Sequence, residues 1–367
     1  MPELVVIAEQ LVAAVPGGAG RYTRELLAAL AATAPDGWEV TAAISRTGDP
    51  DRAAVDGVGA PKVLPLPRKA LITAWEHGLP LWPGGDSVHA MTPLAPPRKR
   101  GRGLVVTVHD TVPWTHPETL TPRGVAWHRR AIGRATRDAD TIVVPTEAVA
   151  ADLANRTSVR AAVQVVGEGV SPALLAEPEP DHARIVAATL PPRFLLIIGT
   201  LEPRKGHEHL IEALARPEAP AIPLVIVGEP GWGDVDPLRL AERCGLPAER
   251  VRVLRQVGDA ELAVLLRLAT ALVAPSLAEG FGLPLIEAMA VGTPVVHSDV
   301  PALVEVAGTA GLAVRRADPR ALARALRLVV DDPDQRAKLA EAGPRRAEHF
   351  SWDRAARDVW RAHLGRT

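Results

Sequence analysis

Two glutamates enclose a glycine-rich segment, EGFGLPLIE, at positions 279 and 287. The apolar run ALVAPS (271–276) before it reads as a buried strand, and Pro284 is suited to the first turn of a helix. Glu279 is therefore expected in the loop between strand and helix, and Glu287 about one turn into the helix. A carboxylate in that position is a good double acceptor for the diol of a ribose. Either glutamate alone would be interpreted as a solvated surface side chain.

The glycines between these acids favour a phosphate ligand. Gly280 and Gly282 permit a close approach of the backbone to a bound molecule. The amides of Gly282 and Leu283 would stand free at the N-terminus of the helix, where they attract phosphate. The whole segment therefore predicts a site for a phosphorylated nucleoside.

A second segment, GTLEPRKG (199–206), carries cations to a similar position. It follows the apolar strand FLLIIGT and precedes the helical stretch HEHLIEALA. Arg204 offers a bidentate fork and Lys205 a compact point charge, a combination suited to a diphosphate. Adjacent cations are more often a solvated pair at a helix start. The scarcity of lysine in this chain and the position at a strand end favour the binding site instead.

These segments resemble those of glycosyltransferase family four, the retaining group 1 enzymes of the GT-B fold. The resemblance rests on EGFGLPLIE, on GTLEPRKG, on PTEAVAADL (145–153) and on FSWDRAA (350–356), and it extends over nearly the whole chain. The segments are similar to those of bacterial mannosyl- and related transferases that build surface glycans or glycolipids.

The resemblance implies a set of donor contacts. Arg204 and Lys205 would hold the diphosphate, Glu287 the ribose, and Glu279 the hydroxyls of the donor sugar. The backbone from residue 280 to 283 would hold the pyrophosphate. The nucleotide-sugar site implied in this way comprises Gly17, Gly18, Gly199, Arg204, Lys205, Val257, Glu279, Gly280, Phe281, Gly282, Leu283 and Glu287. Arg255-Gln256-Val257 stands where the family usually has a glycine, in the loop that commonly frames the base, so the base is left open.

The first half contributes a histidine and a glycine loop to the expected site. The strand LVVTVH ends in His109, which matches the histidine that the family places beside the donor sugar. VPGGAGRY (15–22) matches the family's glycine loop through Gly17 and Gly18. A dinucleotide-binding loop is the alternative interpretation, but Thr23 occupies its third glycine position. The catalytic residues expected are His109, Arg204, Lys205 and Glu279.

The implied activity is retaining transfer of a sugar from a nucleotide-diphosphate sugar, with GDP-mannose as the first choice, to a hydroxyl of a glycan or lipid-linked acceptor. A UDP-sugar donor is the alternative within the family. Other classes remain open: a glycoside hydrolase using the two glutamates, a non-hydrolysing sugar-nucleotide epimerase, and a non-catalytic nucleotide-sugar-binding scaffold. No cofactor and no metal are expected, because the acid pairs at 138–140 and 234–236 lie at helix ends.

The elements that must position these residues form two series of alternating strands and helices. Nearly continuous Val/Ile/Leu runs separated by helical stretches indicate parallel sheets covered on both faces. We expect an α/β protein of GT-B architecture, with two Rossmann-like doubly wound domains facing a central cleft. The N-terminal, acceptor-side domain is predicted at 1–176, with the C-terminal helix 350–367 packing back on it. The donor-binding domain is predicted at 177–349, and the proline-rich segment 171–192 is expected to be a linker.

Composition excludes several other classes. The chain has 367 residues, with 42 Lys+Arg against 43 Asp+Glu, so it lacks the basic surplus typical of nucleic-acid binding. A single cysteine excludes an internal disulfide, and no signal peptide or membrane span is expected, which favours the cytoplasm. The stretches 69–82 and RKRGR (98–102) allow two interpretations: peripheral contact with the inner face of the cell membrane, or a core helix and a solvated basic loop.

Overall fold

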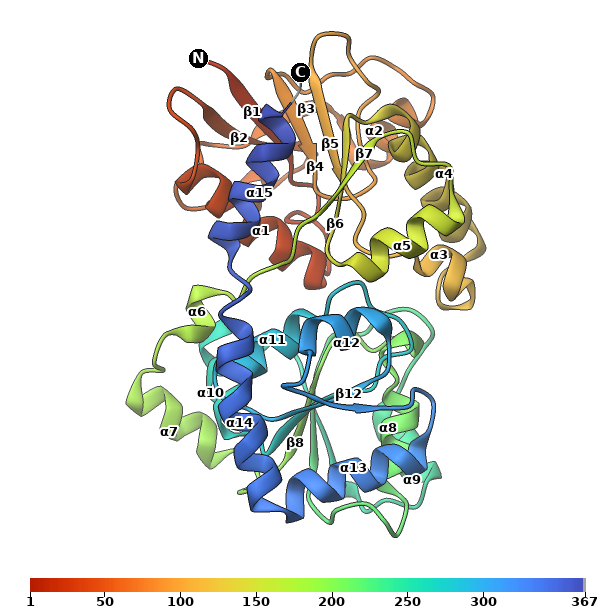
Figure 1. The fold of residues 1–367 in the computed structure, drawn as a ribbon, viewed down its shortest axis with the longest axis vertical. Helices are drawn as coiled ribbons and strands as arrows, with labels where there is room; N and C mark the ends of the chain where they lie inside the picture. Colours follow the sequence, from red (N-terminus) through yellow and green to blue (C-terminus); the bar gives the residue numbers. More distant parts are fainter. Residues whose placement is uncertain (366–367) are drawn as a thin grey trace. The chain divides into compact units, whose positions relative to one another are not determined.

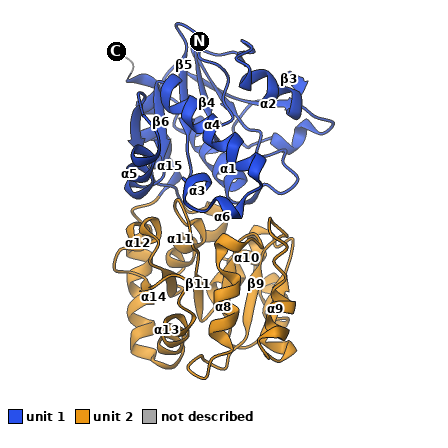
Figure 2. Ribbon diagram, turned by 90° about the vertical axis from the view of Figure 1, so that its right-hand side faces the viewer, with its two compact units in different colours: residues 1–169, 351–367 blue, residues 170–350 orange. Residues whose placement is uncertain are grey.

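The computed structural model describes residues 1–365 and divides into two compact units. One comprises Met1–Gly169 with Ser351–Thr367, and the other comprises Val170–Phe350 (Figure 2). The division falls after Gly169 rather than after residue 176. The reason is local: Arg267 donates hydrogen bonds to the carbonyls of Leu174, at 2.9 Å, and of Leu175, at 3.0 Å, and so ties that segment to the second unit.

The first unit is a seven-stranded parallel sheet in the order β3-β2-β1-β4-β5-β6-β7 (Figure 1). Its strands are β1 (Glu3–Ile7), β2 (Glu39–Arg46), β3 (Lys62–Pro67), β4 (Ser87–Ala90), β5 (Gly103–Thr107), β6 (Thr141–Val144) and β7 (Ala162–Val165). Its helices are α1 (Gly17–Ala32), α2 (Arg68–Glu76), α3 (Val112–Thr115), α4 (Pro122–Asp138), α5 (Glu147–Arg156) and α15 (Trp352–Leu364). The central strands are buried along their whole length, as a parallel sheet covered on both faces requires.

The second unit is a six-stranded parallel sheet in the order β10-β9-β8-β11-β12-β13. Its strands are β8 (Leu195–Ile198), β9 (Leu224–Val227), β10 (Val251–Leu254), β11 (Ala271–Ala274), β12 (Val295–Ser298) and β13 (Leu312–Val314). Its helices are α6 (Pro172–Leu175), α7 (Pro180–Ala188), α8 (His207–Leu214), α9 (Pro237–Arg243), α10 (Asp259–Leu268), α11 (Leu283–Ala290), α12 (Pro301–Ala307), α13 (Pro319–Asp331) and α14 (Pro333–Ala347).

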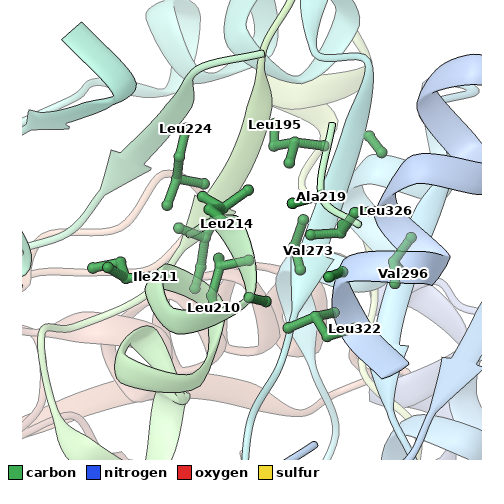
Figure 3. Close-up of a cluster of buried hydrophobic side chains, with 14 of the residues drawn as sticks. Leu195, Leu210, Ile211, Leu214, Ala219, Leu224, Val273, Val296, Leu322 and Leu326 are labelled. Atoms are coloured by element: carbon green, nitrogen blue, oxygen red, sulfur yellow. The ribbon is translucent and has the colours of Figure 1, made fainter. Parts of the chain in front are cut away.

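One face of this second sheet is closed by α8 and α13. Leu210, Ile211 and Leu214 of α8 are buried against the strand residues beneath them (Figure 3). Leu322 and Leu326 of α13 belong to the same cluster. This packing fixes α8, and with it the loop before α8, against the end of β8.

The two parallel, Rossmann-like sheets confirm the α/β class expected from the sequence. Three strands, β2, β3 and β13, lack the nearly continuous Val/Ile/Leu run from which the sheets were predicted. β2 is only weakly apolar, and β3 contains two prolines, which a sheet tolerates there because β3 is an edge strand. β13 is an edge strand of three residues. The linker prediction for 171–192 was wrong, because α6 and α7 form there and pack against α10.

The C-terminal helix α15 belongs to the first unit, where it packs beside α1 (Figure 1). Trp360 is 3% exposed, its ring edge meets Trp38 at 5.4 Å between centroids, and its Nε1 donates to the carbonyl of Leu30 at 3.1 Å. The last helix therefore completes a core that begins with β1.

Trp360→Ala is expected to lower the free energy of unfolding of the first unit by about 3–5 kcal/mol, since it removes a fully packed ring and leaves a cavity. Urea unfolding followed by far-ultraviolet circular dichroism measures the loss. Trp232→Ala is the matched control, because Trp232 is 45% exposed and its loss should cost about 0.5 kcal/mol or less. Equal losses in the two variants would contradict the structural role of α15.

Candidate functional site

The candidate site of the second unit lies where two adjacent parallel strands end. β8 and β11 are neighbours, so the loops that follow them, 199–206 and 275–282, leave the same edge of the sheet. The amide of Leu277 donates to the carbonyl of Arg204 at 2.7 Å and joins the loops. Gly206 has φ +72°, and a Cβ there would lie 2.2 Å from the carbonyl oxygen of Pro275. Only glycine allows the two loops to approach so closely.

Glu279 binds both cations of the neighbouring loop. Its Oε1 accepts hydrogen bonds from Lys205 Nζ at 2.6 Å and from Ser276 Oγ at 2.8 Å, and its Oε2 accepts one from Arg204 Nη1 at 3.2 Å. The side chains of Glu279 and Lys205 are 11% and 16% exposed. The structure thus brings together three of the residues predicted for the donor site, and it pairs them with one another.

These cations control the protonation of Glu279. Burial, the largest single effect, acts to raise the pKa of its carboxyl, and the charges of Lys205 and Arg204 act to lower it. Hydrogen bonds from Lys205 and Ser276 act in the same direction, and the pKa falls from its ordinary 4.5 to about 2. Glu279 is therefore an ionised acceptor at neutral pH and holds no proton to donate.

The glycine segment after Glu279 shapes the start of α11. Gly282 has φ +102°, a left-handed backbone conformation that favours glycine, and a Cβ there would also displace the end of the Leu303 side chain, 2.5 Å away. Phe281 is buried, and its ring edge meets Phe350 at 5.4 Å between centroids. Leu283 is the first residue of α11, beside the buried Gly280. The helix N-terminus therefore has the geometry that attracts phosphate, next to two cations.

Glu287 lies one turn along α11 and is only 2% exposed. Its contact with a ribose remains a prediction. Gly199 continues the sheet at the end of β8, since its amide donates to the carbonyl of Val227 at 2.9 Å. The loop after β10 holds the half-buried Val257, and there the amide of Gln256, at φ +55°, donates to Glu229 Oε1 at 2.8 Å.

In the first unit, His109 follows β5 and is held by the backbone. Its Nε2 lies 2.8 Å from the carbonyl oxygen of Met91, and because a carbonyl only accepts, Nε2 carries the hydrogen. Burial lowers the pKa of His109, although the Met91 hydrogen bond and the charge of Asp110 oppose the shift. The imidazole is then neutral at pH 7, and its Nδ1 lies 3.9 Å from Glu168 Oε1, too far for a hydrogen bond.

Gly17 and Gly18 begin α1 and are exposed, and Gly17 has φ +58°. One turn later Tyr22 is buried, with its ring edge against His109 at 4.6 Å between centroids. The hydroxyl of Tyr22 lies 3.1 Å from Thr107 Oγ1. The glycine loop and the histidine of the first unit are thus linked through one aromatic side chain.

Known proteins match both halves of the chain. The family described as "Glycosyltransferase Family 4" matches residues 16–174, and the one described as "Glycosyl transferases group 1" matches residues 179–346. The chain belongs to glycosyltransferase family 4.

Individual relatives agree with this membership. The chain is 38% identical over 163 residues to O-antigen chain mannosyltransferase B of Escherichia coli, a match that covers 44% of this chain and 42% of that protein. It is 43% identical over 173 residues to the D-inositol 3-phosphate glycosyltransferase of Streptomyces avermitilis, covering 44% of this chain and 37% of that protein. The chain thus spans about two fifths of the length of these curated relatives.

Solved structures share the GT-B fold of this family 4 member. Sucrose-phosphate synthase from Thermosynechococcus elongatus aligns with a TM-score of 0.79 at 25% identity, over 98% of both chains. WaaG, a glycosyltransferase involved in lipopolysaccharide biosynthesis, aligns with a TM-score of 0.74 at 20% identity, over 99% of this chain and 100% of that one.

Two polar residues of the candidate site were missed in the sequence. Ser276 holds the carboxylate of Glu279, and Glu202 Oε1 lies 2.8 Å from Arg204 Nη2. The only sequence signal for either was its position inside a predicted loop. The acid pairs near 138 and 234 have structural partners: Asp140 binds Arg98 at 2.6 Å, and Asp236 accepts from the amide of Leu238 at 3.1 Å.

Glu279→Gln is expected to lower the free energy of unfolding at pH 7 by about 3 kcal/mol, the equivalent of a pKa shift from 4.5 to about 2. Because the folded-state pKa is depressed, this stabilisation is present above about pH 4.5 and is lost as the pH falls toward 2. Urea unfolding across that range, with wild type and variant compared at each pH, measures the decline. Glu208→Gln, an exposed acid in the first turn of α8, should show a small difference that does not follow this pattern. A constant deficit in Glu279→Gln would contradict the assigned ion pairs.

Proposed function

We propose that this chain is a retaining glycosyltransferase that moves a sugar from a nucleotide-diphosphate sugar to a hydroxyl of a glycan or glycolipid acceptor. The observation that carries the proposal is the cluster of Arg204, Lys205 and Glu279 beside the N-terminus of α11. Two fixed cations and free helix amides at one strand edge are what a diphosphate requires.

The chemistry follows from where charge develops. When the bond between the sugar and the β-phosphate breaks, the phosphate oxygen keeps the electron pair and gains negative charge. Arg204, Lys205 and the amides of α11 are preorganised to stabilise that charge. His109 and the glycine loop of the first unit are proposed to contact the donor sugar and the phosphate. The proposal requires no metal ion and no cofactor.

The state of Glu279 argues against the hydrolase alternative. A glycoside hydrolase needs one carboxyl that is protonated near neutral pH, which requires a raised pKa. The pKa of Glu279 is lowered to about 2, and both of its oxygens already accept hydrogen bonds from neighbouring side chains. We assign it to holding the cations and orienting the donor sugar, not to acid or nucleophilic catalysis.

GDP-mannose is the proposed donor, on the support of the named mannosyltransferase of Escherichia coli. A UDP-sugar is the alternative, and product analysis without an acceptor separates both from an epimerase. Turnover by the purified chain would exclude a binding scaffold. O-antigen fragments and D-inositol 3-phosphate, the compounds in the relatives' names, are the acceptors to test first.

Lys205→Ala is expected to reduce turnover about a hundredfold to a thousandfold, since it removes a fixed charge from the departing phosphate. It should also abolish thermal stabilisation by nucleotide. In the wild type, GDP or UDP at a hundred times its dissociation constant should add about 2.7 kcal/mol of stability.

Differential scanning fluorimetry with GDP, UDP, ADP and TDP measures the stabilisation and identifies the base. Lys338→Ala is the control, because Lys338 is exposed on α14 of the same unit and should leave both readouts unchanged. Near-wild-type turnover in Lys205→Ala would refute the proposed phosphate site.

One surface of the first unit supports a peripheral contact with a membrane. Among residues 1–365 no helix is both long and apolar enough to span a bilayer. One groove is lined by Trp75 of α2, by Trp127 and Arg134 of α4, and by Arg98. The stretches 69–82 and 98–102 therefore meet at one surface, which α4 extends with five arginines: Arg123, Arg129, Arg130, Arg134 and Arg137. We propose that the exposed cations around this groove contact anionic lipid headgroups.

Replacing Lys99, Arg100 and Arg123 by serine is expected to weaken binding to vesicles of anionic phospholipid about a hundredfold, at about 1 kcal/mol for each cation. All three side chains are exposed, so the fold should persist. Co-sedimentation with anionic and with neutral vesicles measures the partitioning. A matched triple serine variant at the exposed Arg216, Arg243 and Lys338 of the second unit should bind as the wild type does. Equal sedimentation of both variants would remove the membrane contact from the proposal.

A further inference from the structure

The cation cluster contains a second acid that the proposed chemistry does not use. Glu202 Oε1 lies 2.8 Å from Arg204 Nη2, while Nη1 of the same guanidinium donates to Glu279 Oε2 and to the carbonyl of Ala278. The Glu202 side chain is 16% exposed. Its Oε1 is buried and accepts no hydrogen bond from residues 1–365. The contact between Glu202 and Arg204 is therefore an ion pair without hydrogen-bond geometry.

The backbone holds Glu202 firmly in this position. Its amide donates to the carbonyl of Thr200 at 2.9 Å, and its own carbonyl accepts from the amide of Lys205 at 3.1 Å. The preceding residue, Leu201, forms a β-bridge with Pro230. A short turn thus fixes the acid and the two cations as one unit.

The two acids balance the two cations. Arg204 and Lys205 contribute two positive charges, and Glu202 and Glu279 contribute two negative charges at ion-pair distance. Glu279 and the carbonyl of Ala278 already bind Nη1 of Arg204 at 3.2 Å. Loss of the Glu202 charge would therefore leave Arg204 held in place by other contacts, but it would give the cluster a net positive charge.

Neutrality matters most for the product. An intact nucleotide sugar carries its β-phosphate as a diester, while the nucleoside diphosphate left after transfer has a terminal phosphate whose second ionisation lies near pH 6. The product is therefore more negative than the donor, and an excess of positive charge would retain the product more than it would attract the donor.

We propose that Glu202 lowers the affinity of this site for the nucleoside diphosphate product and so favours its release, an inference that rests on the function proposed above. The carboxylate of Glu202 repels each negative phosphate charge that binds beside Arg204. Because the product has the larger charge, the carboxylate weakens product binding more than donor binding.

Glu202→Gln tests this directly, since glutamine keeps the shape and a carbonyl oxygen toward Arg204 but removes the charge. Isothermal titration with GDP and with UDP should show about tenfold tighter binding than in the wild type, equivalent to about 1.4 kcal/mol. GDP-mannose and UDP-glucose should gain less, about threefold. Glu202→Ala, which also removes the contact with Arg204, should bind the diphosphate less tightly than the glutamine variant.

Glu208→Gln is the matched control. It removes one negative charge from the exposed first turn of the adjacent helix, and it should change each dissociation constant less than twofold. Unchanged or weaker diphosphate binding in Glu202→Gln would overturn the inference while leaving the phosphate site intact. An equal gain in Glu208→Gln would also overturn it, because the tighter binding would then follow from the net charge of the protein and not from the position of Glu202. Failure of the wild type to bind any of these nucleotides would overturn the inference and the proposed function together.

Discussion

The carboxylate of Glu279 is the contact on which the candidate site depends. It receives Lys205 and Arg204 from the loop after β8 while it belongs to the loop after β11, and so it locks two strand ends together. A buried carboxylate without partners would be costly, and each cation alone beside an apolar sheet edge would be costly as well. Pairing them keeps both cations in place before any ligand arrives, which reduces the rearrangement that binding requires.

Two glycines allow the chain to bring Glu279 and the two cations into contact. Gly206 lets the first loop approach Pro275 of the second, and Gly282 turns the chain into α11 against Leu303. A Cβ at Gly206 would meet the backbone of Pro275 and force the loops apart, and a side chain at Gly282 would strain its left-handed backbone. The apolar cluster under α8 and α13 then carries these loops on a rigid base. The conformational freedom of the glycines and the packing of the core therefore together determine the positions of Glu279 and its two cations.

The sequence predicted the parallel sheets and the loops of this site because both have strong local signals. Buried Val/Ile/Leu strands alternate with helices, and EGFGLPLIE and GTLEPRKG stand at strand ends. The mutual pairing of Glu279 and Lys205 was not predicted, because residues 74 apart in the chain leave no periodic signal of their contact. Both side chains were assigned to the ligand instead. β3 was missed for a different reason: its prolines contradict a central strand, and its place at the edge becomes visible only in the folded sheet.

In the first unit, too, a predicted site residue depends on contacts with residues far away in the chain. Here the distant partner is the helix α15. His363 of α15 lies with Nδ1 2.6 Å from Ser87 Oγ and Nε2 3.2 Å from His89 Nδ1. His89 continues the chain of contacts to Thr107 at 2.9 Å, and Thr107 reaches the hydroxyl of Tyr22. Burial lowers the pKa of His89 to about 3, so its ring is neutral at pH 7 and can both donate and accept. The helix at the far end of the sequence thereby helps to fix the tyrosine that packs against His109.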